Sequence, residues 1–179
     1  MQAPASLRRP LAIVFCDIVG ASRVIAREGD LVASTVFREF LEHAGRLGKE
    51  HHCLMIKFIG DAFLATFENI DDVIPLVFSV ERLLSQNHTF IGRLEGFKFS
   101  LHYGDCLCID TSYGSDVLGE DVNIAAYLNE IAQPHEIIIS QAALQRMPRD
   151  FRDRAGASET RQFKRVGEVE FRRVNLLGS

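Results

Sequence analysis

The sequence predicts an α+β fold in which a sheet of mostly antiparallel strands carries helices on one face. Two observations support this prediction. Apolar runs rich in strand-forming residues alternate with longer stretches whose apolar residues recur at helical spacing. In the first hundred or so residues the order is strand, helix, strand, strand, helix, strand, which is the order of a split βαβ, ferredoxin-like sheet.

The first half of the chain supplies a strand, a long helix and a hairpin. An apolar run that ends at Asp17 is typical of a buried strand, and Asp30 can cap the amphipathic helix that follows. Two shorter strand-like runs flank a connection that contains Gly60, which suits a hairpin and places Asp61 at a tight turn. The predicted elements of this half are strands at residues 11–16, 53–58 and 62–67 and a helix at residues 30–49.

The second half continues the alternation of helices and strands. Ser140 is a suitable cap for a short helix, and residues 156–160 are the most loop-like stretch. We see no internal repeat and no linker, so we expect a leader over residues 1–10 and a single domain over residues 11–179. The predicted elements are helices at residues 69–86, 120–131 and 140–147 and strands at residues 97–103, which residues 106–109 can continue, 136–139 and 168–174.

Composition excludes several classes of protein. The 179 residues are 47% hydrophobic and 25% charged, which is ordinary for one globular domain. A net charge of -4 provides no general attraction to nucleic acid or acidic membranes, so we expect neither as a partner. No apolar run reaches the roughly 18 residues of a membrane helix. No signal peptide precedes the four cysteines, Cys16, Cys53, Cys106 and Cys108, so we expect reduced thiols and a cytoplasmic location.

Asp17 and Asp61 are the first candidates for chemistry. Each lies at the end of, or just after, one of two strands that we expect to be neighbours, so the two carboxylates can share a pair of divalent ions. Hard oxygen ligands suit Mg²⁺ or Mn²⁺. The alternative is that each aspartate merely terminates a strand, since carboxylates are common in turns.

Three ordered motifs decide between these alternatives. They are FCDIVG at residues 15–20, KFIGD at residues 57–61 and DVLGEDVNIAA at residues 116–126. In this order they resemble the successive motifs of class III adenylate and guanylate cyclases, and the resemblance extends over nearly the whole chain. It implies a cyclase fold that agrees with the predicted order of strands and helices.

The resemblance assigns roles to most of the candidate residues. It implies that Asp17, Asp61 and the backbone carbonyl of Ile18 hold two Mg²⁺ or Mn²⁺ ions. The segment from Ile18 to Ser22 would lie against the triphosphate, where backbone amides can bind phosphate oxygens. The residues that would contact the phosphates in this segment are Val19, Gly20, Ala21 and Ser22.

Lys57 and Asp116 stand where the family reads the purine base. Lysine donates to N1 of adenine, and aspartate accepts from the N6 amino group. Guanine would present an acceptor to Asp116 and a donor to Lys57, which leaves both groups mismatched. The expected substrate is therefore ATP. Taken singly, Lys57 is more simply a surface lysine on an edge strand and Asp116 a solvated loop acid. Their joint occurrence at motif positions reverses that preference.

Asn123, Lys164 and Tyr127 complete the comparison with the family. Asn123 matches the asparagine that orients the ribose, although it would otherwise serve as a helix cap. Lys164, in FKRVG at residues 163–167, matches a lysine that contacts the terminal phosphates, and a solvated lysine is the equal alternative. Tyr127 departs from the pattern, because the family carries there an arginine that stabilises charge on the α-phosphate. The candidates to replace that arginine are Arg23, Arg27 and Arg165.

The expected activity is conversion of ATP to 3′,5′-cyclic AMP and pyrophosphate at a homodimer interface. The resemblance implies that Asp17 and Asp61 act with Lys57, Asp116 and Asn123 of the other subunit. The main alternative is a degenerate domain that binds nucleotide or a partner with little or no catalysis, because Tyr127 is neutral. A heterodimer whose partner supplies arginine is a third possibility. The connection from Tyr103 to Asp116 is also shorter than the family's usual dimerisation arm.

Two other kinds of site have weaker support. His102 with Cys106 and Cys108, or the run of His51, His52 and Cys53, suggests zinc, but neither has a second matched pair at metal-ligand spacing. The sequence contains neither a Walker-type phosphate loop nor a Gly-x-Gly-x-x-Gly motif.

Overall fold

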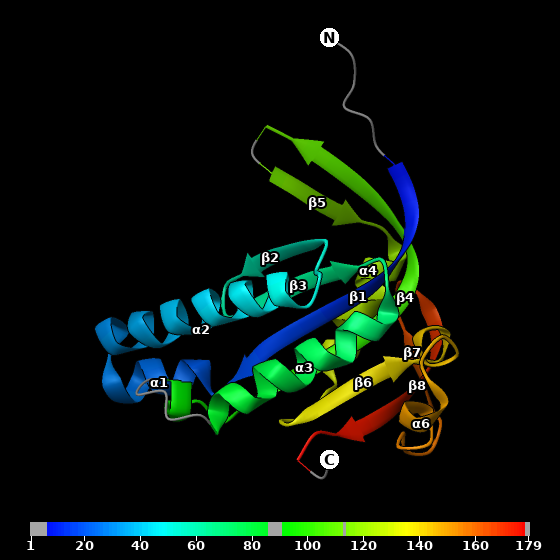
Figure 1. The fold of residues 1–179 in the computed structure, drawn as a ribbon. Helices are drawn as coiled ribbons and strands as arrows, with labels where there is room; N and C mark the ends of the chain where they lie inside the picture. Colours follow the sequence, from blue (N-terminus) through cyan, green and yellow to red (C-terminus); the bar gives the residue numbers. More distant parts are fainter. Residues whose placement is uncertain (1–6, 86–90, 113, 178–179) are drawn as a thin grey trace.

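The computed structural model describes residues 7–85, 91–112 and 114–177 (Figure 1). β1 (Leu7–Val19) begins inside the stretch that we expected to be a leader, so residues 7–10 belong to the sheet. The whole of β1 pairs with β4, from Leu7 opposite Cys108 to Val19 opposite Gly96. Residues 1–6 lie outside the described part of the chain.

One sheet of eight strands organises the described residues. The strand order is β2-β3-β1-β4-β6-β8-β7, and β5 pairs with β4. Only β4 and β6 are parallel neighbours; the other described pairs are antiparallel. The part β2-β3-β1-β4 has the order of a split βαβ unit, which confirms the predicted fold class. The bounds not yet given are β2 (Met55–Ile59), β3 (Ala62–Phe67), β4 (Gly96–Thr111), β5 (Gly114–Leu118), β6 (Glu136–Ser140), β7 (Glu159–Phe163) and β8 (Gly167–Asn175).

Helices cover both faces of the sheet, whereas we expected them on one face (Figure 1). Alternate residues of β1 explain this, because Val14 and Cys16 face the main core while Leu11 and Ile13 face the opposite side with Ala125 of α4. A strand buried on both sides needs a cover on both sides. The main core is covered by α1 (Ala21–Glu28), α2 (Asp30–Glu50), α3 (Val73–Glu81), α5 (Gln141–Leu144) and α6 (Arg149–Arg152), and the opposite face by α4 (Glu120–Glu130).

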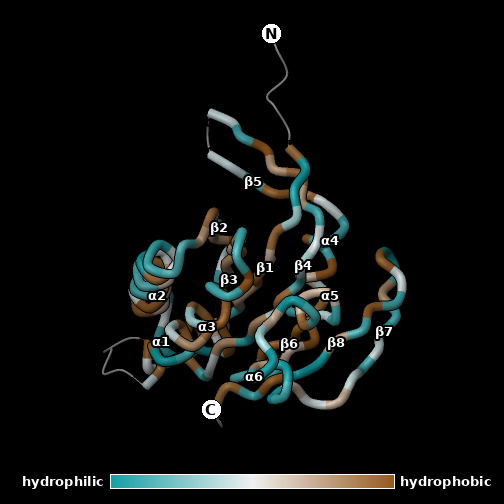
Figure 2. Tube along the Cα trace, turned by 45° about the vertical axis from the view of Figure 1, so that its right-hand side comes forward, coloured by the Kyte–Doolittle hydropathy of each residue, from teal (hydrophilic) through white to brown (hydrophobic). Residues whose placement is uncertain are grey.

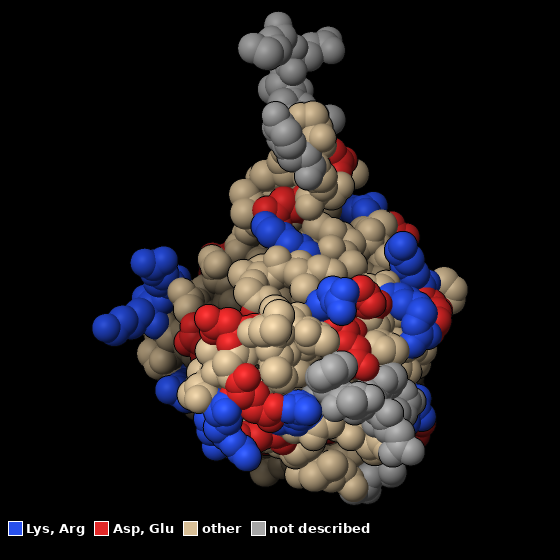
Figure 3. All heavy atoms as spheres, turned by 90° about the vertical axis from the view of Figure 1, so that its left-hand side faces the viewer, with Lys and Arg blue, Asp and Glu red and all other residues tan. Residues whose placement is uncertain are grey.

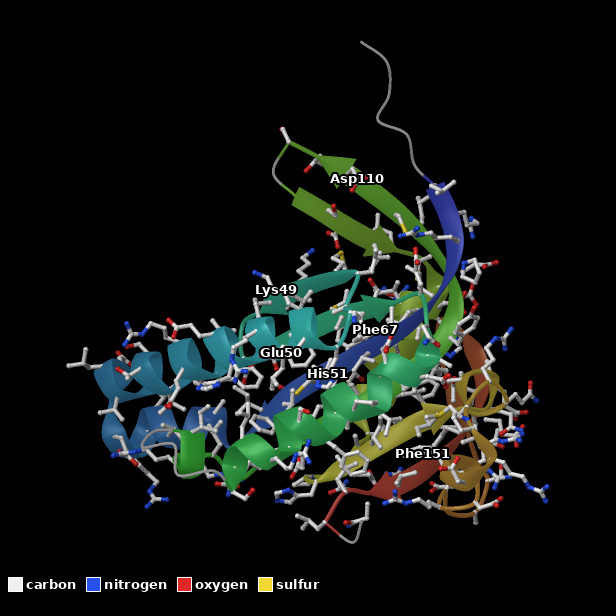
Figure 4. All side chains as sticks on the ribbon, in the orientation of Figure 1. Lys49, Glu50, His51, Phe67, Asp110 and Phe151 are labelled. Carbon is white, nitrogen blue, oxygen red and sulfur yellow. The ribbon has the colours of Figure 1, made fainter. Side chains whose placement is uncertain are left out.

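Aromatic side chains fill the main core between α2 and the sheet. The rings of Phe40 in α2 and Phe97 in β4 stack with centroids 5.1 Å apart. Phe63 joins them from β3, on the other side of β1. Figure 2 shows hydrophobic residues concentrated between the helices and the strands. At the end of α2, labelled in Figure 4, Nε2 of His51 lies 3.0 Å from Oγ of Ser79 and joins α2 to α3.

Several predicted boundaries need correction. α2 agrees with the predicted helix, but Asp30 is its first residue and Gly29 is the capping position. The predicted helix at residues 69–86 is interrupted, because the 3-10 turns Ile70–Asp72 and Arg82–Leu84 flank α3, and residue 86 lies outside the described part. β7 starts within residues 156–160, which we expected to be a loop. The sequence analysis also missed α1, α6, β5 and a 3-10 turn at Ile91–Arg93.

The connection between Tyr103 and Asp116 is a projecting hairpin. β4 runs on to Thr111, and β5 returns along it in antiparallel pairing (Figure 1). Near its tip, labelled in Figure 4, Asp110 accepts a hydrogen bond from the hydroxyl of Ser115 at 2.6 Å. The hairpin therefore carries Asp116 out beside β2.

Candidate functional site

Asp17 and Asp61 lie next to each other on paired strands. Asp17 is opposite Ala62, the first residue of β3, and Asp61 occupies the turn directly before it. The backbone N–H of Ile18 donates to the carbonyl of Asp61 at 3.2 Å. We expected Asp17 at the end of its strand, but β1 continues to Val19. Pairing of β1 with β3, rather than strand ends, brings the two aspartates together.

Lys98, which the sequence analysis did not single out, lies against Asp17. The two residues are opposite each other in β1 and β4, and Nζ of Lys98 is 3.0 Å from Oδ2 of Asp17. The signal that could have found Lys98 is its place between Phe97 and Phe99. Both phenylalanines are buried in the main core, so strand alternation turns Lys98 to the opposite face.

The segment after β1 forms an uncapped helix start. Gly20 takes a left-handed conformation (φ 86°, ψ 7°) and is the capping position of α1, where no side chain accepts from the first amides. The N-terminus of a helix attracts anions, because its first N–H groups lack intrahelical partners and the helix dipole is positive there. The predicted phosphate-contacting residues therefore lie at an uncapped helix start, and their contact with phosphate stays a prediction.

Glu95 lies over this turn, and the positive φ of Gly20 favours glycine at that position. A Cβ atom at position 20 would lie 2.8 Å from Cδ of Glu95. The same carboxylate pairs with Arg23 at 2.5 Å. Arg23, one of the residues expected to replace the missing arginine, is therefore engaged with Glu95.

Lys57 and Asp116 meet between β2 and β5. Nζ of Lys57 lies 2.5 Å from Oδ2 of Asp116, and this hydrogen bond is the main reason that the pKa of Asp116 is lowered. A hollow of about 590 Å³ opens beside them, lined by both residues together with Met55 and Ser115. The structure thus brings together the two residues predicted to read the base.

Asn123, Tyr127 and Lys164 gather at α4 and the β7–β8 turn. Asn123 is exposed on α4, and because Gly119 is the capping position, Asn123 is not the cap. The ring of Tyr127 stacks on Phe163 of β7, with centroids 5.5 Å apart and planes 14° from parallel. Lys164 and Arg165 follow Phe163 in the turn between β7 and β8.

The predicted site residues form two groups within one chain. Asp17 and Asp61, with Lys98 and the start of α1, make one group. Lys57 and Asp116, which contact each other, begin the second, and the family's pattern assigns the exposed residues of α4 to it. Among the described residues, no hydrogen bond or ion pair links the two groups. A site that needs both groups is therefore not assembled by these contacts alone.

Two carboxylates and a nearby carbonyl are a donor set for hard divalent ions. The structure supports this fit, because a cation, the ammonium of Lys98, already lies against Asp17. Within residues 7–85, 91–112 and 114–177, no cluster of three or more His, Cys, Asp or Glu side chains is placed to hold a metal. The two aspartates would thus need oxygen ligands from backbone, water or substrate.

Two of the residues considered for zinc, His102 and Cys106, are poorly suited to bind it. Nε2 of His102 lies 2.8 Å from Asp121, and its Nδ1 lies 2.8 Å from Ser140. Cys106 is buried, and burial raises the pKa of its thiol to about 12. Both ring nitrogens are occupied and the thiol stays protonated, so these groups are poor zinc ligands.

No helix in the described ranges has the length and apolar character needed to span a bilayer. On the face shown in Figure 3, acidic and basic side chains are interspersed and form no large patch of one sign.

Comparison with solved structures finds similar folds in both kinds of purine cyclase. The guanylyl cyclase Cya2 matches with a TM-score of 0.76 at 21% identity, over 94% of this chain and 93% of that one. The adenylyl cyclase CyaB from P. aeruginosa matches with a TM-score of 0.72 at 16% identity, over 96% of each chain. The core of a rhodopsin-guanylyl cyclase with converted specificity, in complex with ATPαS, matches with a TM-score of 0.81 at 15% identity, over 96% and 99%.

Sequence comparison supplies the family. No curated protein matches the sequence. The family model of the adenylate and guanylate cyclase catalytic domain matches residues 4–173, which is nearly the whole chain. This match and the three ordered motifs agree with the fold. The chain therefore belongs to the family of adenylate and guanylate cyclase catalytic domains.

Proposed function

We propose that this cyclase domain is an adenylate cyclase, which converts ATP to 3′,5′-cyclic AMP and pyrophosphate. The observation that carries the proposal is the contact between Lys57 and Asp116 at 2.5 Å beside a hollow of about 590 Å³. Family membership leaves the choice between ATP and GTP open. The donors and acceptors of these two side chains support ATP.

Adenine can replace each partner of this ion pair with a complementary group. Its N1 accepts from the ammonium of Lys57, and its N6 amino group donates to the carboxylate of Asp116. Guanine would place its O6 acceptor against Asp116 and its N1 donor against Lys57. Because unpaired polar groups in a binding site cost about 1–3 kcal/mol each, this mismatch favours ATP.

The metal-binding group would act on the triphosphate. Asp17, Asp61 and the carbonyl of Ile18 would hold two Mg²⁺ or Mn²⁺ ions, which when bound lower the pKa of the 3′-hydroxyl and neutralise phosphate charge. Lys98 must then leave Asp17, and its ammonium becomes available to the anionic substrate. The amides at the start of α1 would bind phosphate oxygens.

The reaction is a substitution within one nucleotide. The 3′-oxygen of the ribose forms a bond to the α-phosphorus and gives its proton to solvent, while the bond from that phosphorus to the bridging oxygen of pyrophosphate breaks. Asn123 would orient the ribose, and Lys164 would contact the terminal phosphates. Tyr127 offers one neutral hydroxyl donor, whereas the guanidinium of an arginine would supply several N–H donors in a planar, positively charged group.

The site would be completed in a dimer. Among the described residues no hydrogen bond or ion pair joins the two groups, and a homodimer that joins them across its interface would have two equivalent sites. Exposed apolar side chains on β2 and β5 support an interface there, since Phe58, Ile59 and Leu118 are 37%, 47% and 50% exposed. A heterodimer whose partner supplies an arginine is the alternative arrangement, and activity gained on mixing with that partner would reveal it.

A second candidate function is nucleotide or partner binding with very low catalysis. The observation that favours it is the stack of Tyr127 on Phe163. Tyr127 is neutral and packs against another ring, whereas the family has a positively charged arginine at this position. Loss of one charged donor at the α-phosphate lowers the rate by about a hundredfold to a thousandfold in comparable sites.

The deciding experiment is incubation of the protein with ATP or GTP and Mn²⁺ over a range of protein concentrations. Chromatography would quantify the cyclic nucleotide. We expect cyclic AMP from ATP, rising more steeply than linearly with protein because the dimer is the active form. A preference for GTP would contradict the substrate, and tight nucleotide binding without cyclic product would favour the second candidate.

A further inference from the structure

The carboxylate of Asp121 joins the first turn of α4 to β4 through both of its oxygens. Oδ1 accepts from Nε2 of His102 at 2.8 Å, and Oδ2 accepts from the backbone N–H of Asp105 at 2.7 Å. Hydrogen bonds to an ionised acceptor are shorter and stronger than neutral ones. Two such bonds fix both the position and the orientation of the side chain, and therefore of the helix turn that carries it.

Gly104 provides the space for this carboxylate. A Cβ atom at position 104 would lie 2.1 Å from Cγ of Asp121, which is far inside any contact distance. The backbone of Gly104 is not among those with positive φ, so the glycine is not required for its conformation. It is required because the side chain of Asp121 lies directly over its Cα atom.

His102 supports Asp121 from inside the protein. Its side chain is almost fully buried, and Nδ1 lies 2.8 Å from Oγ of Ser140. Burial lowers the pKa of His102, so the ring is neutral. With Nε2 donating to Asp121, Nδ1 accepts from the hydroxyl of Ser140, and that hydroxyl in turn accepts from the N–H of Ala143 at 3.2 Å. Every polar atom of this chain of contacts then has a partner.

The arrangement of Asp121, His102 and Ser140 has the residue types of a nucleophilic triad, but Ser140 is only 1% exposed. Its hydroxyl caps α5, and no substrate can reach it. The contacts therefore serve the placement of α4. A second bond supports this reading, because the hydroxyl of Ser100 donates to the carbonyl of Ala125 at 2.6 Å and again ties α4 to β4.

We propose that Asp121 is a positioning residue, held by His102, the amide of Asp105 and the space at Gly104, that fixes α4 so that Asn123 can meet the ribose. The inference rests on the proposed cyclase function, because Asn123 has a role only there. Asn123 follows Asp121 by two residues in the same helix turn, so a shift of one moves the other. Asp121 itself does not touch the substrate.

The test is a double-mutant cycle of Gly104→Ala and Asp121→Ala. Each single variant should lower kcat by about ten- to a hundredfold, with KM within about threefold of wild type, because a small displacement of a reacting group affects the chemical step most. The double variant should be no worse than Asp121→Ala, since the methyl group that Gly104→Ala adds then fills space that the carboxylate has left. Additive losses in the double variant would overturn the proposal.

Hydrogen exchange of the α4 amides gives a readout that does not depend on turnover. Exchange should accelerate in both single variants. Asn69→Ala is the matched control for a general loss of stability, because it removes the side-chain acceptor for the N–H of Asp71, at a sequence position far from α4. It should leave α4 exchange and kcat unchanged. Wild-type exchange at α4 in both single variants would also overturn the proposal. If wild-type protein makes no cyclic product, the proposed function fails, and the exchange cycle still decides whether Asp121 holds α4.

Discussion

At the scale of single residues, the pair of Lys57 and Asp116 has a measurable electrostatic signature. The hydrogen bond from Lys57 lowers the pKa of Asp116 in the folded protein. A carboxyl group of this kind contributes its stabilisation above its unfolded pKa of about 3.9 and loses it as the pH falls through the lower folded value. Lys57→Met should therefore raise the pKa of Asp116 toward the ordinary value, as measured by an NMR titration of its carboxyl carbon.

The control for this titration is Lys49→Met, which removes a lysine from the last turn of α2 (Figure 4). It should leave the pKa of Asp116 unchanged. Lys57 and Asp116 are 44% and 36% exposed, so solvent screening keeps the effect on stability small. An unaltered titration in Lys57→Met would mean that the pair does not form in solution.

Tyr127 is the residue at which catalysis and stability make opposite demands. Its stack on Phe163 is of a kind that contributes about 0.5–1.5 kcal/mol beyond area burial. We predict that Tyr127→Arg raises kcat by about a hundredfold or more, because it restores positive charge at the α-phosphate, and slightly lowers the melting temperature. Kinetics and thermal unfolding of the same samples would measure both.

Tyr127→Phe is the matched control, because it keeps the stack and removes only the hydroxyl. It should retain the stability of wild type and lose activity if the hydroxyl is a donor to the phosphate. An unchanged kcat in Tyr127→Arg would place residue 127 away from the reacting phosphate.

At the scale of elements, the two ends of α1 each depend on a glycine with positive φ, Gly20 at the start and Gly29 at the end. Gly20 and Gly29 have φ values of 86° and 82°, but only Gly20 has a neighbour, Glu95, within contact distance of an added Cβ. Either glycine replaced by alanine should lose stability, by about 1 kcal/mol or more. Only Gly20→Ala should also weaken binding of nucleotide with Mn²⁺, because it shifts the first amides of the helix.

Calorimetric titration with a non-hydrolysable ATP analogue would compare the two variants. Gly29→Ala is the control, since it lies at the other end of α1 and meets no atom within 4 Å. Equal affinities in the two variants would show that the start of α1 does not bind the triphosphate.

Motifs and periodicity predicted the elements whose signals are local. The hairpin of β2 and β3 and the long helix α2 follow directly from apolar runs, Gly60 and helical spacing. The side of the sheet on which α4 packs was not predictable. It depends on β1 having a second apolar face, and a continuous apolar run does not show which of its residues point to which face. β5 was missed because the segment Gly114–Leu118 is short and only its last two residues are apolar.

The same distinction applies to the site residues. Residues inside a recognised motif, such as Asp61 and Lys57, were found. Lys98 and Gly104 were not, because their roles depend on what lies opposite or above them after folding, Asp17 in one case and Asp121 in the other. Contacts across strands have no fixed spacing in the sequence.

At the scale of the whole molecule, the separation of the two residue groups predicts how inactive variants should combine. Asp17→Asn disables the metal-binding group and Lys57→Met disables the base-reading group. A homodimer of either variant alone should therefore be inactive. In a mixed dimer, one site receives both substitutions and the other receives neither. At equal amounts, half of the dimers are mixed and each has one intact site, so about a quarter of wild-type activity should return.

A mixture of Asp17→Asn with Asp61→Asn is the matched control. Both substitutions lie in the same group, so every site of every mixed dimer keeps one of them, and no activity should return. Cyclic AMP formation after mixing, with subunit exchange followed by native mass spectrometry, measures both cases. Restoration in the first mixture alone requires that a functional site combine residues of two chains, whereas no restoration in exchanged dimers would mean that both groups act within one chain.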